Sequence, residues 1–234
     1  MDACQPQATV LQQISGKSPP STIPREIYPG LQYALKPSIT LYVGRKGSGK
    51  SFNLVQLLCD KNGLRGLYDE IIIFSGTFKT QYDSLWKRIS SKGVTVFEDL
   101  TNVEAVYNNQ INSFPKKHIL LLSDDMDVQW AKMDQQVLNR IITNSRHANI
   151  SMVFLIQKMT MCSTIIRCNA DCIASFSSCS FMEFEALYRE FSTMEKKQFH
   201  KLFTDITALP YHYMTCCMQN GNIEVYDSFK IKAH

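Results

Sequence analysis

The sequence predicts an α/β fold, with helices on both faces of a central, mostly parallel β-sheet and an antiparallel β-hairpin near the C-terminus. Three observations predict it. Short apolar, β-branched runs alternate with helical patterns, the run at 118–122 is apolar from its second residue to its last, and Asn220-Gly221 separates two further strand-like runs. Alternating strands and helices favour parallel pairing, apolar strands suit a sheet covered on both faces, and Asn-Gly is the strongest short hairpin signal.

The first strand is expected at 38–43, where the run is apolar and β-branched, and a helix is expected at 52–58 after a glycine-rich turn. The elements that follow repeat this alternation. Strands are predicted at 69–74, 94–97, 118–122, 150–156 and 171–176, and the helices between them at 82–89, 103–111 and 133–144.

The C-terminal part departs from that alternation. Helices are predicted at 183–191 and 194–203, where aromatic residues recur at helical spacing. Such a stripe indicates a core-facing surface rather than a platform for stacking bases. Strands at 211–218 and 223–229 then flank the Asn220-Gly221 turn and form the predicted hairpin.

A length of 234 residues favours one large domain, predicted at 37–234. Residues 1–36 are polar, contain several prolines and show no sustained periodicity, so they are expected to form an extended N-terminal arm or tail. The net charge of +4 is mild. It permits local loops to contact nucleic acid but lacks the strongly basic character of a dedicated binding domain.

No apolar run approaches the roughly 20 residues that span a bilayer, and the N-terminus lacks the pattern of a signal peptide. A soluble, intracellular protein without a transmembrane segment is therefore expected. Eight cysteines occur without any C-x-x-C pair, which favours reduced, mostly buried thiols over a disulfide framework. A metal site within 162–179 is the alternative.

The phosphate-binding loop pattern G-x-x-x-x-G-K-[ST] is matched in full by Gly44, Arg45, Lys46, Gly47, Ser48, Gly49, Lys50 and Ser51. The predicted strand before it and the predicted helix after it supply the context that this motif needs. Glycines allow successive backbone N–H groups to face a phosphate, and the helix N-terminus adds a partial positive charge. The pattern therefore predicts a site for a nucleoside triphosphate.

Within this loop, Lys50 is expected to reach the β- and γ-phosphates of ATP, and the Ser51 hydroxyl to bind Mg²⁺. The pattern does not specify Arg45 or Lys46. These two side chains either contact phosphate or a neighbouring subunit, or are solvated charges of the loop.

Two acidic residues follow the apolar run at 118–122, separated from it by Ser123. We assign Asp124 to Mg²⁺ and Asp125 to the general base that polarises the attacking water. Adjacent carboxylates at a strand end are costly without a cation or water to satisfy them, which favours this interpretation over a solvated turn. Gln157 ends the predicted strand at 150–156, where its amide is expected to sense the γ-phosphate and the attacking water.

Several segments together resemble the FtsK/HerA superfamily of DNA-translocating ATPases, and within it the poxvirus-type genome packaging ATPases of large DNA viruses and virophages. They are the phosphate loop, the strand with its acidic pair at 119–125, the stretch at 145–157 and the run at 165–169. The third segment is the most specific, because an Arg-His pair leads into a strand that ends in Gln. Asp125 is a departure, since many translocases carry Glu there.

The resemblance implies a RecA-like P-loop NTPase core that hydrolyses ATP to push double-stranded DNA, irrespective of its sequence, into a preformed capsid. It also implies a ring of five or six subunits, capsid proteins as partners, and a location in the host-cell cytoplasm or virus factory and in the virion. Arg146 and Arg167 are the candidates for completing a neighbouring subunit's site; a structural ion pair is the alternative for each.

Two other functions remain open. One is a small P-loop nucleotide or small-molecule kinase, which needs an arginine-rich lid. The segment that follows Gln157, at 158–164, has no arginine, which counts against a kinase. A non-hydrolysing, nucleotide-gated scaffold does not need the water-activating residues Asp125 and Gln157.

Overall fold

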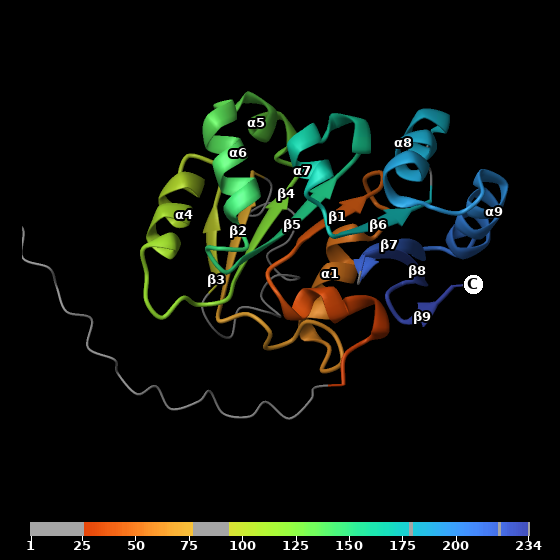
Figure 1. The fold of residues 1–234 in the computed structure, drawn as a ribbon, viewed down its shortest axis with the longest axis horizontal. Coiled ribbons are helices and arrows are strands. Elements are labelled where there is room, and N and C mark those ends of the chain that lie inside the picture. The colour runs from red at the N-terminus through yellow and green to blue at the C-terminus, as the bar shows by residue number, and fades with distance from the viewer. Residues whose placement is uncertain (1–25, 77–93, 178–179, 220, 234) are drawn as a thin grey trace, which may run out of the picture.

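The structure is a computed structural model that describes residues 26–76, 94–177, 180–219 and 221–233. A nine-stranded sheet forms the centre of this part of the chain (Figure 1). Six strands pair in parallel, which confirms the predicted parallel sheet. Their order across the sheet is β3 (Val94–Phe97), β2 (Glu70–Ser75), β4 (Ile119–Asp124), β5 (Ile150–Ile156), β1 (Ile39–Val43) and β6 (Cys172–Phe176).

The sheet continues beyond β6 with antiparallel strands, which confirms the predicted C-terminal hairpin. β6 pairs with β7, β7 with β8 and β8 with β9. The strand β9 has only two residues and is too short to be recognised in the sequence. Their bounds are Tyr213–Gln219 for β7, Asn222–Asp227 for β8 and Ile231–Lys232 for β9.

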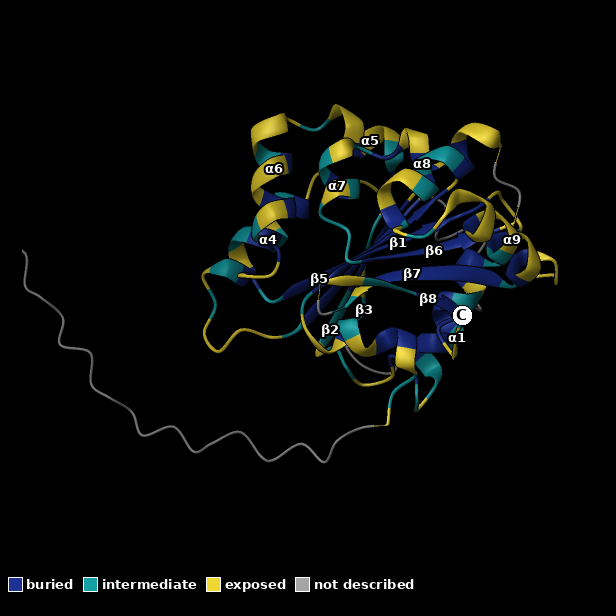
Figure 2. Ribbon diagram, turned by 45° about the vertical axis from the view of Figure 1, so that its right-hand side comes forward, coloured by how far each residue is buried: buried dark blue, intermediate teal, exposed yellow. Residues whose placement is uncertain are grey.

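Helices cover both faces of the sheet (Figure 2), as predicted. One face carries α1 (Lys50–Cys59) and the 3₁₀ helix η1 (Pro29–Leu35). The opposite face carries α4 (Val103–Ile111), α5 (Asp127–Lys132), α6 (Gln135–Asn144), α7 (Thr164–Cys168), α8 (Phe181–Phe191) and α9 (Lys196–Thr207). Strands in the centre are almost wholly buried because both of their faces are covered.

Two short α-helices of the described part were not predicted. α5 and α7 have six and five residues, fewer than two turns, so no apolar periodicity can identify them. The helix predicted at 82–89 lies outside the described residues. The other predicted helices are present, with ends that differ by a few residues.

The expected N-terminal arm is described only from residue 26 onward. Within it, η1 buries Leu31 completely against the α1 side of the sheet, and the Gly30 N–H donates to Phe229 O at 3.0 Å. A side chain at position 30 would lie 2.9 Å from the Phe229 backbone, so only glycine permits this approach. The division of the chain at residue 36 stays a prediction, with residues 29–35 packed on the same sheet as the domain that follows.

The cysteines differ from the prediction at one place. Cys172 and Cys217 are joined as a disulfide between β6 and β7, so the expectation of reduced thiols is wrong for this pair. The antiparallel register puts the two residues directly opposite each other. A separation of 45 residues gives no sign of this in the sequence. Four other cysteines of the described part are not joined in disulfides: Cys59, Cys162, Cys168 and Cys216.

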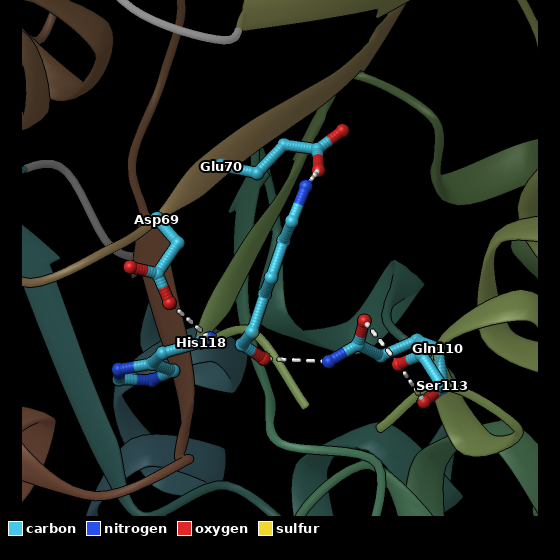
Figure 3. Close-up of polar contacts among 6 residues, drawn as sticks. Asp69, Glu70, Gln110, Ser113 and His118 are labelled. Carbon is cyan, nitrogen blue, oxygen red and sulfur yellow. Dashed lines mark hydrogen bonds and ion pairs between the residues drawn. The ribbon is translucent and has the colours of Figure 1, made fainter. Parts of the chain in front are cut away.

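Hydrogen bonds fix the start of β4 against its neighbours (Figure 3). The His118 N–H donates to Asp69 Oδ2 at 2.7 Å, just before β2, and Gln110 Nε2 on α4 donates to Lys117 O at 2.5 Å. β4 then keeps one register with β2 along its whole length. These bonds at one end of the strand therefore help to place Asp124 at the other.

Candidate functional site

The phosphate loop connects β1 to α1 at the carboxyl edge of the parallel strands, where ligands bind in open α/β sheets. Gly47 and Gly49 have φ of 80° and 97°, in the left-handed region that glycine adopts without strain. A Cβ at Gly44 would lie 2.7 Å from Ser48 Oγ. The loop conformation therefore depends on glycine at all three positions.

Lys50 is the first residue of α1 and is 7% exposed. Its Nζ donates to Gly44 O at 2.6 Å and to Arg45 O at 3.3 Å, so the side chain folds back over the loop. Burial lowers the Lys50 pKa, while Asp125 and Asp124 act to raise it. Arg45 and Lys46 are both exposed, and their contribution to nucleotide binding stays a prediction.

The acidic pair lies where β4 ends. Asp124 is 3% exposed, and its Oδ2 has no hydrogen-bond partner among the described residues. Burial, and then the charge of Asp125, raise the Asp124 pKa to about 7, whereas Lys50 opposes the shift. A buried carboxylate oxygen without a partner is costly, which is the situation expected of a ligand awaiting a cation.

Ser123, which interrupts the apolar strand, has a structural role. Its Oγ accepts a hydrogen bond from Trp130 Nε1 on α5 at 2.8 Å. Since successive side chains of a strand point to opposite faces, Ser123 faces α5 and Asp124 faces the side of α1 and Lys50. The serine therefore fixes the register of the acidic pair.

Asp125 and Gln157 lie next to each other, as the sequence predicted for the ends of two neighbouring strands. Gln157 Nε2 donates to Asp125 Oδ1 at 3.4 Å, and the Asp125 N–H donates to Leu155 O at 3.2 Å. Asp125 has a φ of 54°, so the chain turns sharply directly after β4. The structure thus brings the proposed base and the proposed sensor together; their roles stay predictions.

Two further acidic residues lie at the site, and neither was predicted to belong to it. Asp127 begins α5, accepts a hydrogen bond from the Gln157 backbone N–H, and has its pKa raised to about 6 by burial and by Asp125. Glu183 on α8 is buried and accepts from Met159 N at 2.5 Å and from Thr160 Oγ1 at 2.6 Å. It therefore holds the segment that follows Gln157. From the sequence, Asp127 is expected only to start a helix or to lie in a loop, and it does begin α5. Its contact with Gln157 and the position of Glu183 appear only in the folded chain.

The two candidate arginines lie apart from these residues. Arg146 precedes β5, at the edge of the sheet opposite the phosphate loop, and its Nη2 lies 2.6 Å from Asp171 Oδ1. Arg167 on α7 donates to Met159 O at 3.2 Å and lies 3.5 Å from Glu190 Oε1. Each thus has an ion pair within its own chain, and the role of each toward a neighbouring subunit stays a prediction.

The residues present fit ATP and Mg²⁺. Ser48 Oγ and Asp124 Oδ2 are buried polar atoms without hydrogen-bond partners among the described residues, one in the loop and one at the end of β4. The backbone N–H groups of the loop and Lys50 would hold the phosphates. Ser51 and Asp124 would hold the cation through oxygen atoms, which Mg²⁺ prefers.

The raised pKa of Asp124 predicts how pH affects stability. In the folded chain the Asp124 carboxyl has a pKa of about 7, whereas its usual value is 3.8. The folded chain therefore keeps the Asp124 proton at pH values at which the unfolded chain has lost it. The nucleotide-free protein therefore loses stability as the pH rises between these two values. We expect Asp124→Asn to raise the midpoint of thermal unfolding at pH 8, in a chelator, by at least about 2 °C, or roughly 1 kcal/mol.

Lowering the pH to 5 is expected to shrink that difference, because the wild-type carboxyl is then largely protonated. Asp205→Asn, an exposed position on α9, is the matched control. A midpoint for Asp124→Asn at pH 8 that is no higher than that of the wild type would contradict the prediction.

A comparison with models of protein families shows which family this chain belongs to. Residues 35–209 match the family model described as Poxvirus A32 protein. The chain belongs to this family. The match spans β1 to α9, from the phosphate loop through both acidic residues and Gln157. It confirms the resemblance to poxvirus-type packaging ATPases that was predicted from the sequence.

Solved structures share the fold. B204, the DNA-packaging ATPase from Sulfolobus turreted icosahedral virus, is 18% identical with a TM-score of 0.61 over 82% of this chain and 98% of that one. The packaging NTPase B204 of Sulfolobus turreted icosahedral virus 2, in complex with ATP-gammaS, is 18% identical with a TM-score of 0.58 over 81% and 96%. EssC (ATPases 2 and 3) from Geobacillus thermodenitrificans is 12% identical, with a TM-score of 0.55 over 84% and 40%.

These likenesses confirm the predicted P-loop ATPase fold. No curated protein matches the sequence. None of the helices in the described ranges is long and apolar enough to cross a membrane.

Proposed function

We propose that the protein hydrolyses ATP and uses the energy to move double-stranded DNA into a preformed capsid. The observation that carries the hydrolytic part is the pairing of Asp125 with Gln157 at 3.4 Å beside the buried Lys50 and Asp124. Phosphate binding alone needs only the loop. A carboxylate and an amide held together at the adjoining strand ends are what orienting and deprotonating a water requires.

The residues divide the reaction between them. Loop N–H groups and Lys50 bind and orient the phosphates. Ser51 and Asp124 would hold Mg²⁺, which would supply positive charge to neutralise the phosphate oxygens. Asp125 accepts the proton of the attacking water at a carboxylate oxygen. Gln157 orients that water through its amide. Glu183 keeps the segment after Gln157 in place through Met159 and Thr160.

Family membership and the shared fold support DNA packaging as the use of this energy. The B204 proteins are described as a DNA-packaging ATPase and as a genome packaging NTPase, and one complex contains ATP-gammaS. We carry both properties to this chain: ATP as the nucleotide and the viral genome as the cargo. Capsid proteins are then its partners, and its place is the host-cell cytoplasm or virus factory and the virion.

We propose that five or six subunits form a ring around the double-stranded DNA and contact it irrespective of its sequence. An arginine from the next subunit would stabilise charge on the leaving phosphates. ATP hydrolysis at one subunit would then depend on how the neighbouring subunit is placed in the ring. Arg146 is the better placed of the two candidates, because its side chain is 56% exposed, against 17% for Arg167.

The test measures phosphate release from ATP with Mg²⁺, with and without two duplex DNAs of unrelated sequence. We expect both DNAs to raise turnover, and turnover per subunit to rise steeply with protein concentration, as shared sites require. Displacement of the third strand from a DNA triplex then reports movement along the duplex. If the wild-type protein with DNA releases phosphate no faster than Lys50→Ala does, the proposal is wrong.

The same assay separates the two alternatives. Transfer of labelled phosphate to a nucleoside monophosphate, rather than to water, indicates a kinase. Nucleotide binding without turnover, even with DNA and an assembled ring, indicates a scaffold.

A further inference from the structure

A groove beside the phosphate loop lies outside the site described so far. It has a volume of about 680 Å³ and lies where α1 comes close to β7 and β8 (Figure 1). Its walls include Asn53 and Gln56 from α1, Tyr211 and His212 from the turn before β7, and Asp227 from the end of β8. Small-molecule sites have volumes of roughly 300–1,000 Å³ and combine an apolar surface with a few polar groups, as here.

Tyr211 is the unusual residue of this groove. It is 67% exposed, yet its φ is 65°, a conformation that a bulky side chain rarely adopts. Its ring lies against the loop, since a Cβ on Gly49 would be only 3.0 Å from Tyr211 Cδ1. Core packing does not explain an exposed aromatic ring, and strained backbone of this kind clusters at ligand sites.

The strand order shows which part of a nucleotide meets this groove. Asp124 and Gln157 end β4 and β5, on one side of β1, whereas Tyr211 precedes β7, on the other side of β1 beyond β6. A triphosphate whose γ-phosphate faces the acidic pair therefore directs its nucleoside toward Tyr211. From these positions we infer that the groove binds the base and ribose of the nucleotide, with the base stacked on the Tyr211 ring.

The polar groups of the groove fit such a ligand. Gln56 lies on the same side of α1 as Asn53, whose Nδ2 donates to Gly49 O at 3.2 Å. The Gln56 amide offers both a donor and an acceptor to a base edge. Asp227, 3.2 Å from His212 Nδ1, offers carboxylate oxygens to ribose hydroxyls.

The turn that carries Tyr211 is held in place. The His212 N–H donates to Leu209 O at 3.2 Å, and the Ser228 N–H donates to Tyr213 O at 3.0 Å. A turn whose backbone is already fixed loses little freedom when a base stacks on the ring that it carries. The stacking energy is therefore available for binding.

The inference rests on the proposed function, because it assumes that the loop binds ATP, and the test separates the two. Dissociation constants with Mg²⁺ are measured for ATP and for inorganic tripolyphosphate, which lacks the nucleoside. We expect Tyr211→Ala to weaken ATP binding by roughly tenfold and to leave tripolyphosphate binding unchanged. Tyr211→Phe retains the ring and should bind ATP as the wild type does.

Leu209→Ala is the matched control, since Leu209 is exposed in the same turn but does not line the groove. Gln56→Ala provides a second variant, on the opposite wall, with the same expected selectivity for ATP. Equal weakening of ATP and tripolyphosphate, or unchanged ATP binding in both groove variants, overturns the inference. A wild-type protein that binds neither ligand overturns the proposed function itself, and the inference with it.

Discussion

Lys50→Ala is expected to lower ATP turnover by about 10²- to 10³-fold and to weaken ATP binding strongly, because this side chain supplies the positive charge inside the phosphate loop. Lys50 is almost fully buried, and its Nζ donates to Gly44 O and Arg45 O. We expect phosphate oxygens to replace those backbone oxygens when the nucleotide binds. The exchange of a neutral acceptor for a charged one strengthens the bond. Phosphate release and the dissociation constant for ATP measure the two effects.

The matched control is Lys201→Ala, which removes the same charge from the exposed surface of α9 and should leave both quantities near the wild-type values. Lys50→Arg adds a second test. An ammonium is a compact point charge, whereas a guanidinium is larger and planar, so we expect that charge alone does not restore turnover. A Lys50→Ala variant that retains more than about a tenth of wild-type turnover would contradict the assignment, since loss of one such donor typically costs 10²- to 10³-fold.

Residues that act through local geometry could be predicted from the sequence. The phosphate loop is one, because glycines at fixed spacing after a strand force the backbone into one shape. The acidic pair is another, because β4 is apolar up to Ser123 and the chain must turn once that strand leaves the core. Gln157 followed from the same reasoning at the end of β5. The structure brings Asp125 and Gln157 to 3.4 Å of each other.

Contacts between distant segments could not be predicted. Glu183 binds Met159 and Thr160 across 24 and 23 residues, and Cys172 joins Cys217 across 45. Neither pair leaves a pattern in the local sequence. The same limit applies to Tyr211, which lies beside Gly49 only because the sheet order carries β7 next to α1.

The strand order explains why the site has two separate halves. Inserting β5 between β4 and β1 leaves room for Gln157 between the acidic pair and the phosphate loop. On the other side, β6 separates β1 from the turn that holds Tyr211. The sequence predicted the strands but not this order.

Asp125→Asn is expected to lower turnover by about 10²- to 10⁴-fold, the usual contribution of a general base, while ATP affinity changes by no more than a few-fold. An amide cannot accept the proton of the attacking water at pH 7. Phosphate binding remains because the variant leaves Lys50 and Ser51 in place. Single-turnover hydrolysis and equilibrium binding of ATP measure the two quantities separately.

Asp127→Asn is the decisive comparison, because Asp127 lies close enough to Asp125 for their charges to interact, and it accepts a hydrogen bond from the Gln157 backbone N–H. With Asp125 as the base, we expect Asp127→Asn to lower turnover by less than about tenfold, because a neutral amide oxygen accepts a weaker bond from the Gln157 backbone N–H than the carboxylate does. Asp205→Asn, exposed on α9, should have no effect. A larger loss from Asp127→Asn than from Asp125→Asn would move the base to Asp127. The two carboxyl groups have different partners: Asp125 accepts from the Gln157 side-chain amide, and Asp127 accepts from the Gln157 backbone N–H. We therefore expect Asp125, and not Asp127, to share the attacking water with the Gln157 side chain.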